Sequence, residues 1–188
     1  MKRIQLGCLV VVLLFTARLS AQTSAPAEMV DNPIYKSWAS QKPGTKVSAK
    51  SDMGMGGMNM VVDITQTLSE VTPDKVTISV TSTLNMGGQT QTQTNKQDIA
   101  AKVPKGNEFL PQDIKGTVKE TGKDSIDIAG KKYDCVIHEF SGTSEQGQVS
   151  GKLWNCPQVP GNVVKMELSI TGAMAVTTKT TVVSIETK

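Results

Sequence analysis

Apolar and polar side chains alternate with a period of two along most of the chain after residue 44. The alternation is clearest from Val76 to Leu84 and from Val164 to Ile170. Such a period places successive side chains on opposite faces of a strand, so one face is dry and the other is wet. Turn-forming Gly, Pro and Asp residues separate the segments at short intervals, as in hairpins. The pattern predicts an all-β or β-dominated fold with about nine antiparallel strands.

One short helix is expected before the strands begin. Asn32-Pro33 has the form of a helix start, with Asn as the cap and Pro in the first turn. Ile34 and Trp38 are four residues apart, so they share one helical face. A helix is therefore predicted near residues 33–40.

The strand pattern breaks between residues 96 and 114. Gln97 to Lys102 predicts a helical turn, and Val103 to Gln112 predicts a segment that crosses the sheet. The chain has only 3 Phe, 2 Trp and 2 Tyr. A closed sandwich needs more large residues, whereas a curved single sheet with one concave apolar face, partly covered by helix, needs fewer. We therefore expect a curved half-barrel with one or two short helices.

The most unusual stretch surrounds Gly56-Gly57, a pair that favours two-residue hairpin turns. With this turn, Met55 lies opposite Met58, and Met53 lies opposite Met60. Because side chains alternate along a strand, all four thioethers then fall on one apolar face. The other residues predicted to form a ligand site with them on the concave face are Val62, Ile64, Ile78 and Val80, with Trp38 as a plug.

Three interpretations of the four methionines remain open. Methionine commonly fills irregular edges of a core. Its flexible side chain also repacks around varied apolar ligands, such as a lipid, an acyl chain or a hydrophobic peptide. Finally, soft thioether ligands select copper(I), although the single histidine, His138, is distant in sequence.

Residues 1–21 have the order of a secretory signal peptide, with Lys2-Arg3 followed by the apolar run Leu9 to Phe15. This run is too short to cross a bilayer core of about 30 Å. We expect an exported protein, periplasmic or extracellular, with no transmembrane segment after signal removal. Residues 22–31 are predicted to be a flexible tether and residues 32–188 a single antiparallel β domain.

The charge balance excludes one class of partner. The 188 residues include 20 Lys and Arg against 17 Asp and Glu, and the predicted signal peptide holds the surplus as Lys2, Arg3 and Arg18. The mature chain is therefore neutral and contains no arginine. Nucleic-acid binding needs a basic surface and usually arginine forks, so no nucleic-acid partner is expected.

Two cysteines, Cys135 and Cys156, remain after signal removal. The segments Tyr133 to Phe140 and Gln148 to Cys156 are predicted to form one antiparallel pair, which places the two thiols near opposite positions. In an oxidising compartment such a pair predicts a disulfide. The alternative is two separate small core residues.

The search for catalytic chemistry favours no enzyme. His138 shares a strand face with Val136 and Phe140, whereas Cys135 points to the opposite face, which argues against a Cys-His pair. No Gly-x-Ser-x-Gly motif is present. One histidine and two cysteines make a zinc site implausible, so no cofactor is predicted.

Several stretches resemble a family of secreted bacterial β-sheet proteins with no assigned activity: Asn32-Pro33, Trp38-Ala39, Lys42 to Val47, Gly130 to Cys135 and Val159 to Met166. The general layout also resembles the lipoprotein-carrier superfamily of the LolA and LolB type. That resemblance implies a curved antiparallel half-barrel with helices over an apolar hollow that carries acyl chains, and a lipid or lipoprotein as partner.

These observations predict an exported, non-enzymatic protein that binds an apolar ligand on a concave sheet face. Two alternatives remain. One is a copper(I)-binding envelope protein that uses the Met53 to Met60 cluster. The other is a structural envelope protein with no small-molecule site.

Overall fold

The computed structural model describes residues 28–86, 89–110, 114–172 and 175–188. In these ranges the chain forms one helix and eleven strands. Their bounds are β1 (Met29–Asp31), α1 (Pro33–Ala39), β2 (Lys46–Met55), β3 (Met58–Val71), β4 (Lys75–Met86), β5 (Gln89–Ala100), β6 (Lys102–Pro104), β7 (Lys115–Ile128), β8 (Lys131–Ser144), β9 (Gly147–Asn155), β10 (Val163–Thr171) and β11 (Val176–Glu186). The predicted signal peptide and the first part of the predicted tether lie outside the described residues.

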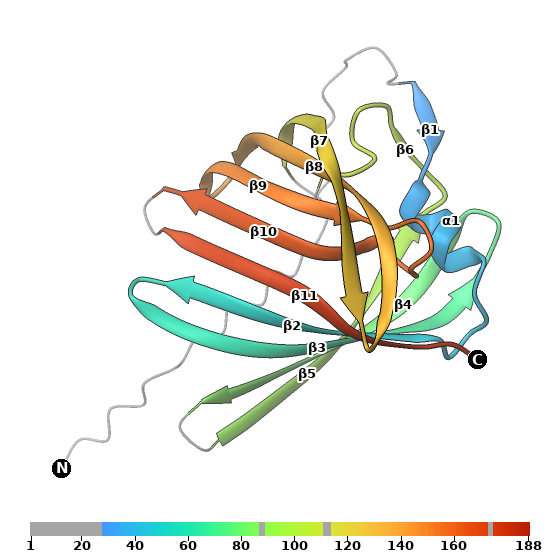
Figure 1. Cartoon of the computed structure of the whole chain (residues 1–188), viewed down its shortest axis with the longest axis horizontal. Coiled ribbons are helices and arrows are strands. Elements are labelled where there is room, and N and C mark those ends of the chain that lie inside the picture. Colours follow the sequence, from blue (N-terminus) through green and yellow to red (C-terminus); the bar gives the residue numbers. More distant parts are fainter. Residues whose placement is uncertain (1–27, 87–88, 111–113, 173–174) are drawn as a thin grey trace.

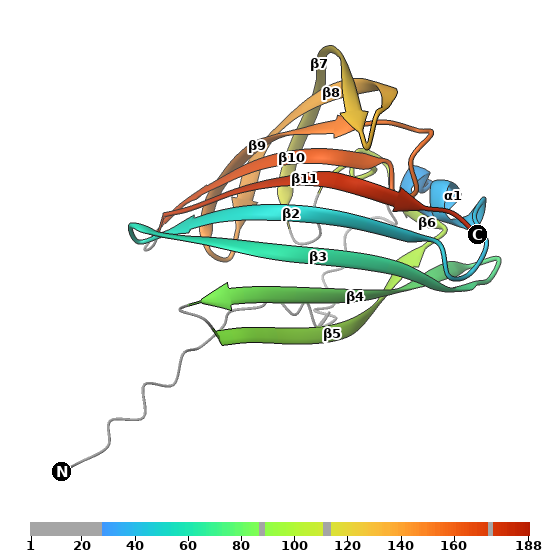
Figure 2. The same ribbon diagram turned by 60° about the horizontal axis from the view of Figure 1, so that its bottom comes forward.

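Nine of the strands form one antiparallel sheet in the order β5-β4-β3-β2-β11-β10-β9-β8-β7. The sheet is curved and does not close into a barrel (Figures 1 and 2). β11 lies in the middle, between β2 and β10, and β5 and β7 form the two edges. The predicted β-dominated fold, with a curved sheet of about nine strands, is confirmed.

The folded part of the chain begins earlier than expected. Residues 29–31 fall within the predicted tether, but they form strand β1, which pairs with β6 outside the main sheet. Asp31 also forms ion pairs with Lys36 at 2.7 Å and with Lys102 at 3.4 Å. Over the described ranges, the chain contains no helix of the length and apolar character needed to span a bilayer.

Helix α1 begins where the sequence predicts. The Asn32 side-chain oxygen accepts hydrogen bonds from the backbone N–H groups of Ile34 at 2.9 Å and Tyr35 at 3.4 Å. These bonds satisfy two donors of the first turn that have no partner within the helix. Pro33 occupies a position where no donor is needed. Trp38 is only 1% exposed and anchors the helix in the main core.

The helical turn predicted for residues 97–102 is wrong. Strand β5 runs through most of this segment, and its Gln97 and Ile99 pair with Ile78 and Val76 of β4. Because both partners are buried, the apolar Ile99 completes a strand period on a buried face instead of a helical turn.

The two faces of the sheet differ in what lies over them. We call one the covered face; it carries the buried side chains of Val47, Ile78, Leu153 and Val182. Helix α1 and the segment after β6 pack against it. We call the other the open face; its side chains, such as that of Lys152, are largely exposed.

The predicted crossing segment is present in residues 103–110, and the remainder of the prediction, residues 111–112, lies outside the described residues. It follows β5 at one edge of the sheet and leads to β7 at the other edge, so the chain must cross the sheet here. Phe109 and Leu110 pack against a cluster of the covered face that contains Phe140, Val149, Leu153 and Ile170.

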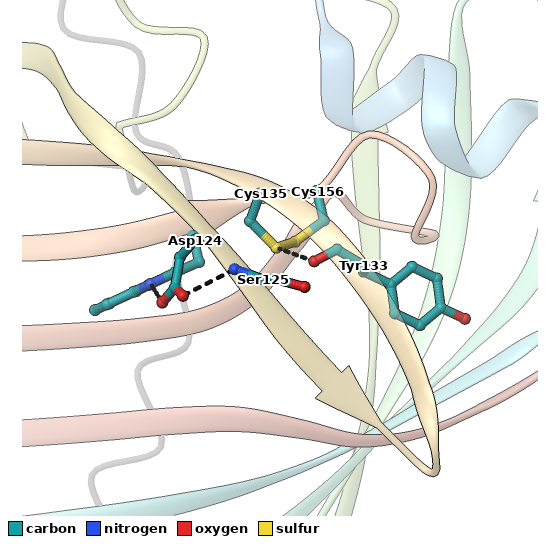
Figure 3. The surroundings of a disulfide bond; sticks show 6 residues. Asp124, Ser125, Tyr133, Cys135 and Cys156 are labelled. Carbon is teal, nitrogen blue, oxygen red and sulfur yellow. Dashed lines mark hydrogen bonds between the residues drawn. A yellow bond between two sulfur atoms is a disulfide. The ribbon is translucent and has the colours of Figure 1, made fainter.

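The β7–β8 hairpin curls over the open face at one end of the sheet (Figures 1 and 3). Trp154 lies on the open side of β9 and yet is only 6% exposed, because it packs with Ile126 and Ile137 of this hairpin. The Trp154 Nε1–H donates a hydrogen bond of 3.0 Å to Asp124 Oδ2 on β7. The curl gives the open face a wall at this end.

The predicted disulfide between Cys135 and Cys156 is confirmed. The predicted pairing of β8 with β9 brings the two Cα atoms to 4.3 Å, and both cysteines are buried. The bond joins the curled hairpin to the residue that follows β9 (Figure 3). Both cysteines belong to the main core, so the bond fixes the curled hairpin to that core.

Candidate ligand site on the covered face

A cavity of about 530 Å³ lies between the covered face, α1 and the crossing segment. This volume falls within the range of small-molecule pockets, roughly 300–1,000 Å³. The lining is mostly apolar. Its apolar members include Ile34, Trp38, Val47, Ala49, Ile64, Ile78, Ile99, Phe109, Leu110, Leu153, Met166 and Val182.

Three residues of the predicted site meet in this cavity: Trp38, Ile64 and Ile78. Ile78 and Trp38 are each 1% exposed, and Ile64 is half-buried. Trp38 reaches the cavity from α1, and its role as a plug stays a prediction. Val62 and Val80 lie on the same face of β3 and β4 but do not line the cavity.

The predicted register of the methionine hairpin is confirmed. Met53 pairs with Met60, and Met55 pairs with Met58, around the Gly56-Gly57 turn. Paired residues share a face, so all four side chains lie on the covered side. They do not line the cavity. Met58 is 58% exposed, and the other three are half-buried.

The methionines nevertheless continue the apolar part of the covered face. Across β11, Met55 pairs with Val176, which in turn pairs with the buried Ile170. Met53 and Leu168 both pair with Thr178, from opposite sides. The hairpin tip is thus joined to the cluster beneath Phe109 and Leu110 by a strip of half-buried apolar side chains. The predicted sheet residues of the site thus share one face, but only some of them line the cavity.

A few polar groups also face the cavity. Gln66 lies opposite Val47 and Val80, and Gln97 lies opposite Ile78, so both amides project from the covered face. A primary amide both donates and accepts hydrogen bonds. These two side chains can therefore hold the polar end of a ligand whose apolar part fills the cavity.

His138 lies outside the cavity lining and contacts it through Phe109. Its ring stacks on Phe109 of the crossing segment, with ring centroids 4.5 Å apart and planes at 21°. Burial lowers the pKa of His138, and the carboxylate of Glu120, directly opposite on β7, partly opposes that effect. Cys135 is disulfide-bonded and offers no thiol. Across the described ranges, no three His, Cys, Asp or Glu side chains are grouped to hold a metal.

The sequence did not single out Ala49, Phe109, Leu110 or Val182 as site residues. The apolar pair Phe109-Leu110 in an otherwise polar crossing segment is the signal that could have located the cover. Ala49 and Val182 face each other across β2 and β11. Only the pairing of these two strands, which are far apart in the sequence, places them in the cavity.

No family model matches the chain, and no curated protein is similar to it. Three solved structures are partly similar to it. A Bacteroides fragilis protein with a YmcC-like fold, inferred to be exported, is 9% identical, with a TM-score of 0.42 over 78% of this chain and 97% of its own. The hypothetical lipoprotein YmcC of Escherichia coli is 8% identical, with a TM-score of 0.32 over 72% and 86%.

The third structure, a DUF1329 family protein of Desulfovibrio piger, is 10% identical, with a TM-score of 0.28 over 80% of this chain and 88% of its own. At these identities and TM-scores the likenesses carry no conclusion about this chain. None of the three descriptions names a lipoprotein carrier of the LolA or LolB type, so that likeness stays a prediction.

Proposed function

We propose that this is an exported, non-enzymatic protein that binds an acyl chain or a similar apolar ligand on the covered face. The acyl chain of the ligand would fill the cavity beneath α1 and the crossing segment, and its polar end would lie near Gln66 and Gln97. The partly open, mostly apolar cavity carries the proposal. The signal-like sequence of residues 1–21 supports export.

The expected affinity follows from the area that such a ligand buries. A chain of about twelve methylenes gains roughly 10 kcal/mol at about 0.8 kcal/mol per buried group. Association costs at least about 4 kcal/mol in lost freedom, which leaves roughly 6 kcal/mol. The dissociation constant is therefore expected near tens of micromolar.

The four methionines of the hairpin, Met53, Met55, Met58 and Met60, have two alternative roles, and each role predicts a different ligand. As a flexible apolar surface, they would guide a chain from the hairpin tip toward the cavity. As a set of soft ligands, they would bind copper(I).

The test is displacement of a fluorescent fatty-acid probe by dodecanoate from the mature protein. Ala49→Phe places a ring in the cavity and should weaken binding at least about tenfold, because the displaced volume is that of several methylenes. Thr65→Phe, on the open face of β3, is the matched control and should bind as the wild type does. Equal binding by the Ala49→Phe variant would contradict the proposal.

A second variant separates the two roles of the methionines. Replacing all four with leucine keeps the apolar strip but removes the sulfur ligands. Fatty-acid binding should change little, whereas a copper(I) protein would lose its metal affinity in a competition titration with a chromogenic chelator. Copper binding by the wild type, without fatty-acid binding, would favour the metal alternative.

A further inference from the structure

A second and larger hollow, of about 1,100 Å³, lies on the open face. It extends across seven neighbouring strands, from β7 at the edge through β8, β9, β10, β11 and β2 to β3. The curled β7–β8 hairpin stands at one end of this face (Figure 1). The hollow is on the opposite side of the sheet from the apolar cavity, so it is a separate site.

A row of charged side chains, which we call the charge row, crosses the hollow at right angles to the strands. Each member pairs directly with the next on the neighbouring strand. In strand order from β7 to β2, the members are Lys119, Glu139, Lys152, Glu167, Lys179 and Asp52. The sign alternates at every step, and the row is neutral overall.

A second row lies two residues further along each strand. We call it the hydroxyl row, because most of its members are serine or threonine. In the same strand order they are Thr117, Ser141, Ser150, Ser169, Thr177, Gly54 and Asn59. A Cβ atom at Gly54 would lie 2.7 Å from Thr177 Oγ1, so glycine keeps this part of the floor open. Small side chains thus lie beside the charges, and the lining also includes the apolar residues Met53, Met60, Val61 and Leu168.

The charge row is mostly not neutralised by its own neighbours. On an ordinary wet face, opposite charges on adjacent strands pair and stabilise the sheet. Here Lys152 pairs with Glu139 at 2.7 Å, but Glu167 pairs with Lys165, outside the row, at 3.0 Å. Within the described ranges, Lys119, Lys179 and Asp52 form no ion pair, and the serines and threonines of the hydroxyl row form no side-chain hydrogen bond. Donors and acceptors therefore remain available to a ligand.

The alternation decides which ligands fit. A polyanion would meet a carboxylate at every second strand, and a polycation would meet an ammonium group, so each would be repelled as much as attracted. A neutral polyhydroxylated chain suits the row, because each hydroxyl accepts from a lysine or donates to a carboxylate. We propose that the hollow binds a neutral, linear oligosaccharide that lies across the strands, over the hydroxyl row.

The spacing of the site supports this ligand. Neighbouring strands lie about 4.8 Å apart, so seven strands span roughly 30 Å. The spacing between neighbouring strands is close to the length of one sugar residue in an extended β-linked glycan. Each strand would therefore face one sugar. Among the described residues, Phe140 is the aromatic residue of the lining, and its ring lies against Gly151 rather than across the hydroxyl row. Binding therefore relies on hydrogen bonds and should be weak for short chains.

The test uses three neutral β-1,4-linked hexasaccharides, of glucose, xylose and N-acetylglucosamine, titrated into the mature protein and followed by NMR. At least one should bind and shift the amide signals of β9, β10 and β11. Lys179→Gln should weaken binding about tenfold, the loss of one charge-assisted hydrogen bond. Lys50→Gln is the matched control, because Lys50 is an exposed lysine of the open face that lies outside the hollow.

A second pair of variants fills space instead of removing charge. Ser150→Phe should abolish sugar binding, whereas Thr65→Phe, on the same face but outside the hollow, should not. Neither variant should affect fatty-acid binding on the covered face, so this inference and the proposed function fail independently. Absence of binding by all three hexasaccharides, or equal losses in the control variants, would overturn the inference.

The charge row is also complementary to itself when it is turned end for end, because Lys119 would then face Asp52 of a second copy. A dimer that dissociates in the Lys179→Gln variant, measured by analytical ultracentrifugation, would assign the open face to self-association. That result would overturn the oligosaccharide assignment.

Discussion

Replacing Phe109 with alanine should expose His138 and loosen the segment that crosses the covered face. The Phe109 ring stacks on the imidazole and packs against the cluster around Phe140. A fully buried phenylalanine costs about 3–5 kcal/mol when it is truncated to alanine. Because Phe109 is half-buried, we expect a loss of about 2 kcal/mol, of which stacking supplies roughly 0.5–1.5 kcal/mol. The melting temperature should fall by about 4–8 °C.

The same substitution should change the titration of His138. Burial lowers the pKa of His138 in the wild type. The neutral imidazole is therefore favoured in the folded state, and its contribution to stability is complete above the unfolded pKa of about 6.5. That contribution is lost as the pH falls through the lower folded pKa. Without the ring, water reaches the imidazole, so the pKa should rise toward its ordinary value and stability should depend less on pH.

His138 is the single histidine of the chain, so its NMR signal is unambiguous. Titration of this signal, with thermal melts between about pH 5 and 8, measures both effects. Phe109→Leu keeps part of the apolar contact and should give intermediate values. Val183→Ala, at a position 41% exposed, should change neither quantity. An unchanged pKa and melting temperature in the Phe109→Ala variant would show that the crossing segment does not cover His138.

Two further predictions concern the framework of the sheet. Replacing both Cys135 and Cys156 with alanine should lower stability by about 3 kcal/mol, the effect of opening a loop of this size, and the wild type should show a matching loss under reductant in thermal melts. Gly151→Ala should cost about 1–3 kcal/mol in urea unfolding, because its methyl group would press on Phe140 and a neighbouring carbonyl. Gly122→Ala, where the nearest atom is 3.9 Å away, is the control, and equal costs would contradict this account.

The sequence predicted local features well, where one short-range rule decides the outcome. The alternation of side chains indicated the strands, the Asn32-Pro33 pair indicated the start of α1, and Gly56-Gly57 fixed the methionine hairpin register. The Cys135–Cys156 disulfide followed from the pairing of two adjacent strands. Each of these features depends on residues that are close in the sequence.

The features that were missed depend on strand order. The charge row joins Lys119 to Asp52 through six strands, and no local pattern reveals that their registers agree. Register shifts, such as the one between Glu120 and Gly122, also move side chains relative to a simple period of two. The lining of the apolar cavity required knowledge of where residues 103–110 cross the sheet.

The central position of β11 has a consequence for how the molecule assembles. Within the main sheet, strands β2 to β5 form one hairpin stack and β7 to β10 form another, and β11 pairs with both. During synthesis both stacks emerge before their common neighbour, each with an unsatisfied edge, β2 and β10, that attracts other chains. Until β11 is in place, the two stacks lack the strand that pairs with both, so the complete sheet forms only after this strand has been inserted.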